Sequence, residues 1–206
     1  MKARGGVGGG GFDPVPVGVH RAVCVAVVDL GMQPAYRAEY KPAYKVLLTF
    51  ELPDELTDNG EPRLISETLT ASMSTKANLR KLIESWFGKG FPSDEAAGDF
   101  DLRNLLGRPA FLNVTHTQKG EKTYAKVTSV IPLPKNAEKP IPSGEPLYYS
   151  EAGDQPLEER SLVYSKLPEW VRKKIDGQIR ATPEPLSVPA GAASTDGAFD
   201  GDDIPF

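Results

Sequence analysis

Apolar and polar positions alternate over several short stretches of the chain, and this alternation predicts strands. In the clearest stretch, residues 44–52, every second side chain is large and apolar: Tyr44, Val46, Leu48 and Phe50. A period of two is typical of a strand with one buried face. Four further strands are predicted from stretches rich in apolar and β-branched residues, at 18–29, 64–72, 109–117 and 123–130. The pattern therefore indicates a mainly β protein.

One helical pattern separates the third and fourth predicted strands. Over residues 76–87, apolar side chains recur at intervals of three and four: Leu79, Leu82, Ile83 and Trp86 or Phe87. Ser74 or Thr75 can cap its N-terminus, and Gly88 follows its last turn. Three strands, a helix and two strands is the order of elements in an OB-fold, a small, partly open barrel. We therefore expect a five-stranded OB-fold barrel with its helix between strands three and four.

Segments of a different composition flank the expected barrel, which covers residues 18–134. Residues 1–17 are rich in glycine and predict a flexible arm. Residues 135–180 begin as a linker interrupted by prolines and include a short helix over 168–179, with a partial apolar stripe of Trp170, Val171 and Ile175. Residues 181–206 contain few large apolar residues, so we expect a disordered acidic tail.

Length and composition narrow the class of protein. The 206 residues allow one domain of ordinary size with tails. The chain has no run of about 18 apolar residues and no apolar signal core near Met1, so we expect a soluble, cytoplasmic protein. Cys24 is the only cysteine and lies in an apolar run, which excludes an internal disulfide and predicts a buried structural thiol.

The net charge of −4 hides an uneven distribution along the chain. Residues 1–135 hold 17 Lys and Arg against 15 Asp and Glu, whereas residues 136–206 hold 7 against 13. The body is thus mildly basic and the C-terminal part acidic. A nucleic-acid partner for the body remains compatible with the overall negative charge.

Two predicted loops combine aromatic and basic residues, the pairing that contacts the bases and phosphates of a single strand. The loop between the first two strands carries Tyr36, Arg37, Tyr40, Lys41 and Lys45, at a place where OB-folds contact oligonucleotides. The loop between the last two strands carries Lys119 and Lys122. Alternation places three further side chains on the outer face of those strands: Phe111, Tyr124 and Lys126. Alternatively, Phe111 and Tyr124 cover a core edge or pack beneath the second helix.

The residues that carry most enzyme chemistry are scarce in this chain. His20 and His116 are the only histidines, and with Cys24 they are too few and too scattered for a structural zinc site. A Gly-x-Ser-x-Gly nucleophile motif is missing, and the acidic residues of the body are spread singly. We therefore expect a protein that is not an enzyme and uses neither a metal nor a cofactor.

The C-terminus carries the most specific motif. Phe206 offers an aromatic anchor together with the free α-carboxylate, and the aspartates before it favour basic partners. The last five residues resemble the acidic tip of bacterial single-stranded DNA-binding proteins: Asp202, Asp203, Ile204, Pro205 and Phe206. In that family the tip is a docking peptide, with the terminal Phe in an apolar pocket and its carboxylate beside a basic residue. The body is more similar to a phage-encoded member with an OB core, which implies a bacterial host cell as its location.

The resemblance implies sequence-nonspecific binding and protection of single-stranded DNA in replication, recombination or repair, with the tip recruiting partner proteins. Two alternatives stay open: an OB-like adaptor that binds protein instead of DNA, and a nuclease that processes DNA. The sequence leaves monomer and dimer equally open, because the usual opening residues of the tetrameric bacterial members are missing. A further hypothesis is that the acidic tail occupies the basic groove when DNA is absent.

Overall fold

The computed structural model describes residues 14–35, 37 and 39–180. The predicted arm over 1–13 and the tail over 181–206 therefore lie outside the described residues, as does Tyr36. The strands are β1 (Gly18–Gln33), β2 (Ala43–Leu56), β3 (Pro62–Thr70), β4 (Pro109–Lys119), β5 (Lys122–Pro132) and β6 (Leu147–Tyr149). The helices are α1 (Asn78–Phe87), α2 (Asp94–Gly98), a 3-10 helix (Leu102–Leu105), α3 (Leu157–Lys166) and α4 (Glu169–Asp176).

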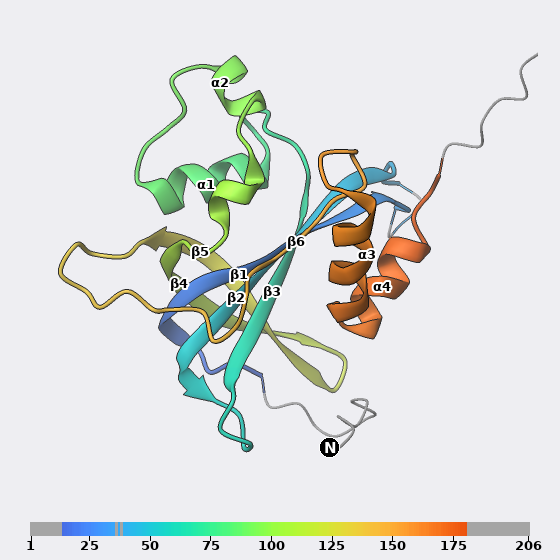
Figure 1. Ribbon diagram of the computed structural model, residues 1–206. Helices are drawn as coiled ribbons and strands as arrows, with labels where there is room; N and C mark the ends of the chain where they lie inside the picture. The colour runs from blue at the N-terminus through green and yellow to red at the C-terminus, as the bar shows by residue number, and fades with distance from the viewer. Residues whose placement is uncertain (1–13, 36, 38, 181–206) are drawn as a thin grey trace, which may run out of the picture.

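The strands form one six-stranded sheet in the order β3-β2-β1-β4-β5, with β6 added to β1 (Figure 1). All neighbours on the main path are antiparallel, and β6 runs parallel to β1. The mainly β prediction is confirmed, but a closed barrel is not: the described residues contain no hydrogen-bonded ladder between β3 and β5. The two end strands nevertheless approach each other, with Cα atoms within 8 Å.

The long strand β1 joins the two halves of the sheet. Its first residues, 18–23, pair with β4, and residues 23–33 pair with β2. Two bulges interrupt the second ladder. At the second bulge Gly31 has a φ of 68°, and its N–H donates to Asp29 Oδ1 over 2.8 Å. Bulges increase the local bend and twist of a strand, which allows β1 to change its partner partway along.

The main core lies between the sheet and α1. The inward side chains of β2 and β4 are fully buried, among them Phe50 and Leu112, and α1 adds Leu79, Ile83 and Trp86. Gly88 ends α1 in the left-handed conformation, as predicted, with a φ of 66°. The predicted cap was wrong, because α1 begins after Ala77 without a side-chain cap.

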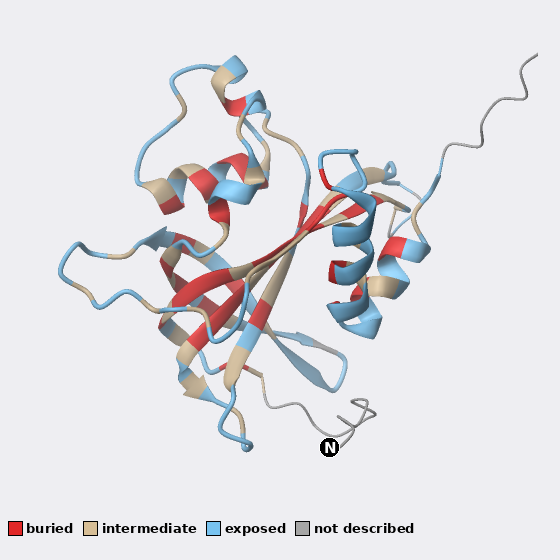
Figure 2. Cartoon of the chain, in the orientation of Figure 1, coloured by how far each residue is buried: buried red, intermediate tan, exposed pale blue. Residues whose placement is uncertain are grey.

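A second core covers the outer face of β1 and β2. Leu30 and Leu47 point to this face and are buried beneath α3 and α4, which Figure 2 shows with their buried sides toward the sheet. The helix predicted over 168–179 is confirmed as α4, but α3 and β6 were not predicted. The predicted stripe was only partly right: Val171 and Ile175 are buried, whereas Trp170 is 47% exposed.

The segments on either side of the five main strands pack against the sheet. Val15 is buried, and its carbonyl oxygen accepts a 2.8 Å hydrogen bond from His116, so the predicted flexible arm is ordered over its last residues. The predicted linker is held by Glu51 on β2, whose carboxylate accepts hydrogen bonds from the N–H and the hydroxyl of Ser143 at 2.9 and 2.5 Å. No helix of the described part is long and apolar enough to cross a membrane.

Candidate nucleic-acid interface

The loop between β1 and β2 exposes most of the side chains predicted to contact DNA. Tyr40 is 57% exposed, and Lys41 is also exposed. Tyr44 is 59% exposed, which corrects the prediction that it shares the buried face of Val46 and Leu48. Arg37 lies 3.5 Å from Glu39, and Lys45 donates a 2.8 Å hydrogen bond to Thr70 Oγ1 on β3. The loop therefore combines aromatic faces with cations at one end of β3.

The β4–β5 hairpin exposes Lys122, Tyr124 and Lys126, as predicted. Tyr124 is 49% exposed and lies opposite Thr117, and Lys126 lies opposite Thr115. These side chains share the outer face of the hairpin, because the buried Val114 and Val127 point inward. The side chain of Lys119 lies outside the described part of the chain.

Phe111 is separate from this group, which corrects the prediction that it lies beside Tyr124 and Lys126. It pairs with Ile131 on β5, six β4 positions from the pair of Thr117 and Tyr124, or about 20 Å along the strand. On its other side it pairs with Arg21 of β1. Phe111 is half-buried on the outer face, so the predicted orientation is right and the predicted neighbours are wrong.

Glu67 on β3 lies close to lysines of both neighbouring segments, Lys45 on β2 and Lys126 on β5. Glu67 on β3 faces inward opposite Leu48, and burial raises the pKa of its carboxyl, while the positive charge of Lys126 on β5 acts in the opposite direction. Glu67 also lines a shallow depression of about 470 Å³ that includes Lys45 and Lys76. Lys45 at the first candidate loop and Lys126 on β5 are thus both close to β3.

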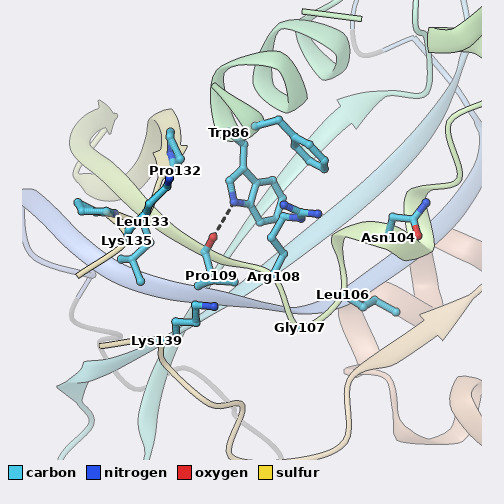
Figure 3. A pocket seen from close by; sticks show the side chains of 12 residues that line it. Trp86, Asn104, Leu106, Gly107, Arg108, Pro109, Pro132, Leu133, Lys135 and Lys139 are labelled. Atoms are coloured by element: carbon cyan, nitrogen blue, oxygen red, sulfur yellow. Dashed lines mark hydrogen bonds between the residues drawn. The ribbon is translucent and has the colours of Figure 1, made fainter. Parts of the chain in front are cut away.

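A second, larger depression of about 550 Å³ lies at the other end of the hairpin, where β4 begins and β5 ends (Figure 3). Arg108, Lys135 and Lys139 line it together with Trp86 and Phe87. The Arg108 guanidinium carbon lies 3.9 Å from the centre of the Phe87 ring. Local sequence patterns did not predict this site. The three cations come from two separate loops, and no periodic pattern links them.

Other ionisable groups of the body are occupied in structural contacts. Arg21 binds Asp54 through two 2.7 Å hydrogen bonds, which lower the pKa of that carboxyl, and also lies 3.3 Å from Glu138. Burial raises the pKa of the Cys24 thiol to about 12. Among the described residues, no group of three or more His, Cys, Asp or Glu side chains could hold a metal ion.

Comparison with known proteins found no match: no protein-family model and no curated protein sequence matches this chain.

Proposed function

We propose that this protein binds single-stranded DNA without sequence preference, through an OB-type β-barrel in which β3 and β5 complete the ring. The arrangement of elements supports the barrel: β1 bends between β2 and β4, the end strands approach each other, and α1 lies between β3 and β4 in the chain. In an OB-fold, strands two and three and the loops before strands two and five form the binding face. Here α3 and α4 cover the outer face of β2, so the two loops and β3 carry the proposed contacts.

The observation that carries the proposal is the exposure of tyrosines beside lysines at both of these loops. Tyr40 and Tyr44 lie at one loop and Tyr124 at the other, each with about half of its surface exposed. An exposed ring can stack on any base, and each lysine can neutralise a phosphate. Stacking and charge neutralisation do not distinguish one base from another, so the sequence preference is expected to be weak.

Partner recruitment by the C-terminal tip belongs to the same proposal. The segment from Asp202 to Phe206 combines two acidic side chains with an aromatic side chain, in the order that resembles the acidic tip of bacterial single-stranded DNA-binding proteins. Such a peptide fits a partner with an apolar pocket and a basic rim. The expected partners are replication, recombination or repair proteins.

The test is a titration with oligo(dT) and with duplex DNA, read by fluorescence anisotropy at several salt concentrations. The intact chain should prefer the single strand. The double variant Tyr44→Ala and Tyr124→Ala should bind about 10- to 100-fold more weakly, because stacking contributes about 1–3 kcal/mol per base.

The matched control is Tyr44→Phe with Tyr124→Phe, which keeps both aromatic faces and should bind like the intact chain. Absence of single-strand binding by the intact chain would overturn the proposal. If the tip then still captured partner proteins, the adaptor alternative would be favoured. Magnesium-dependent cleavage of the oligonucleotide would favour the nuclease.

A further inference from the structure

The depression at the start of β4 holds three cations that the described residues do not neutralise. Arg108, Lys135 and Lys139 have no carboxylate oxygen within 4.0 Å among these residues. In contrast, Arg21 and Arg103 each contact two carboxylates. Three unpaired cations around one concave surface create a positive potential that favours an anion.

The position of Arg108 is set by the backbone and by an aromatic ring. The N–H of Gly107 donates to the carbonyl of Cys24 over 2.8 Å, and the N–H of Cys24 donates to the carbonyl of Arg108 over 3.1 Å. These two bonds tie the segment to the buried middle of β1. The guanidinium stacks on Phe87 through its face, which leaves the N–H groups at its edge available for a ligand. The fork of N–H donors matches the geometry of a phosphate.

Apolar side chains line part of the floor of the depression. Trp86 donates its indole N–H to the carbonyl of Pro109 over 2.9 Å, drawn as a dashed line in Figure 3. Leu106, Pro132 and Leu133 complete the lining beside it. Cations at the rim and an apolar floor suit a ligand that has both phosphates and flat bases.

The outer face of the β4–β5 hairpin connects this depression to the loop that carries Tyr124. The ladder runs from the pair of Thr117 and Tyr124 to the pair of Ala110 and Pro132, about 23 Å along β4. Phe111 and Ile131 are on this face, and Ile131 is 43% exposed. Arg21, which pairs with Phe111 across β1 and β4, binds the carboxylates of Asp54 and Glu138.

We propose that the depression of Arg108, Lys135 and Lys139 is a second contact site for the phosphates of single-stranded DNA. The DNA strand leaves the first contact face at the two loops and reaches the depression along the outer face of the β4–β5 hairpin. This inference rests on the proposed function and extends its footprint. It also gives Phe111 a role as a stacking residue between the two sites.

The test compares a short oligo(dT) of about 8 nucleotides, enough for one OB-fold, with a long one of about 30 nucleotides. The triple variant Arg108→Ala, Lys135→Ala and Lys139→Ala should bind the short strand within twofold of the intact chain. It should bind the long strand at least tenfold more weakly. The slope of log K against log salt for the long strand should become less negative by about 2, since each lost phosphate contact removes about 0.7.

The matched control removes three exposed cations elsewhere, at Lys81, Lys166 and Lys173, with the same change in net charge. It should leave both oligonucleotides within twofold of the intact chain. A double variant, Lys135→Ala with Lys139→Ala, keeps the Arg108 stack and should change the long-strand slope by about 1.4. This double variant replaces the triple variant if the loss of Arg108 disturbs folding.

Two results of the salt titrations would overturn the inference while leaving the proposed function intact. One is an unchanged long-strand slope in both variants. The other is an equal loss for short and long strands, which would make the depression part of the first site. Binding of a peptide of residues 200–206 to the depression, with DNA binding unchanged, would assign it to an acidic peptide and also overturn the inference. Failure of the intact chain to bind either strand would instead contradict the proposed function.

Discussion

Trp86 of α1 is buried in the main core, and replacing it tests how much its packing and its hydrogen bond stabilise the fold. It is 1% exposed, its ring centre lies 5.3 Å from that of Phe50, and its N–H binds the carbonyl of Pro109. Trp86→Phe removes about three heavy atoms from the core, which costs about 2 kcal/mol. It also removes one hydrogen bond, for about 1 kcal/mol more, because water in the depression can reach the freed carbonyl.

The expected loss for Trp86→Phe is therefore about 3 kcal/mol, a large share of the roughly 5–15 kcal/mol that stabilises a typical domain. Urea unfolding followed by far-UV circular dichroism measures it, with an unchanged m value as evidence that the unfolded state is the same. Trp170→Phe is the control, since this side chain is 47% exposed and its replacement should cost less than about 0.5 kcal/mol. Equal stability of the two variants would contradict the role of Trp86 in the core.

Three further predictions concern other parts of the body. Because burial raises the pKa of Cys24 to about 12, its thiol should react with a disulfide reagent at neutral pH only as fast as the protein unfolds, and rapid labelling of the native protein would contradict this. The hydrogen bond from Arg80 lowers the pKa of Glu84, so this pair stabilises the fold above the ordinary pKa of 4.5 and loses its effect as the pH falls through the lowered pKa. The difference in unfolding free energy between the intact chain and Arg80→Met should accordingly shrink in acid, and a constant difference from pH 7 to about pH 2 would exclude this linkage. Gly31→Ala should cost at least about 1 kcal/mol in a urea titration, since a Cβ at a φ of 68° is strained and would overlap the amide of Gln178; Gly144→Ala, where a Cβ meets nothing within 4 Å, is its control.

Strand identity in the main sheet could be predicted because each strand has one face in the core. Val46, Leu48 and Phe50 alternate with side chains on the other face, and this period identifies β2 directly. The ends of the strands were less predictable. Four extra residues of β1 continue through Gly31, since a bulge with a hydrogen bond from Gly31 to Asp29 extends the strand through residues that favour a turn.

The second core was not predictable from local patterns. The segment 157–166 has Val163 as its single buried side chain, so α3 shows almost no apolar periodicity. Its position depends on the outer face of β1, where Ala26 and Val28 are apolar and belong to the second core. Apolar residues on both faces of β1 indicate, in retrospect, that something covers the second face.

The candidate contact residues were predictable where they share a loop and unpredictable where folding brings separate segments together. Arg37, Tyr40 and Lys41 are close in sequence and are exposed together. Arg108 and Lys139 are 31 positions apart and meet only because β4 and β5 pair over their full length and return both segments to one end of the hairpin. Phe111 was placed with the wrong neighbours because alternation gives the face of a residue but not its register.

The end of the described chain bears on how the tail affects DNA binding. The N–H of Ile179 donates to the carbonyl of Met32 over 2.7 Å, so residues 181–206 continue from the base of the β1–β2 loop. On the premise of the proposed function, we hypothesise that the acidic residues of the tail compete with DNA phosphates for Lys41 and Lys45. Deletion of Asp200 to Phe206 should tighten binding of oligo(dT) several-fold at low salt and have little effect near 0.5 M, because salt screens the competing charges.

The control replaces Asp200, Asp202 and Asp203 by Asn in the full-length chain, which removes charge without changing length. Equal affinity of all three proteins at low salt would show that the tail does not occupy the DNA site, and its tip would then act on partner proteins alone.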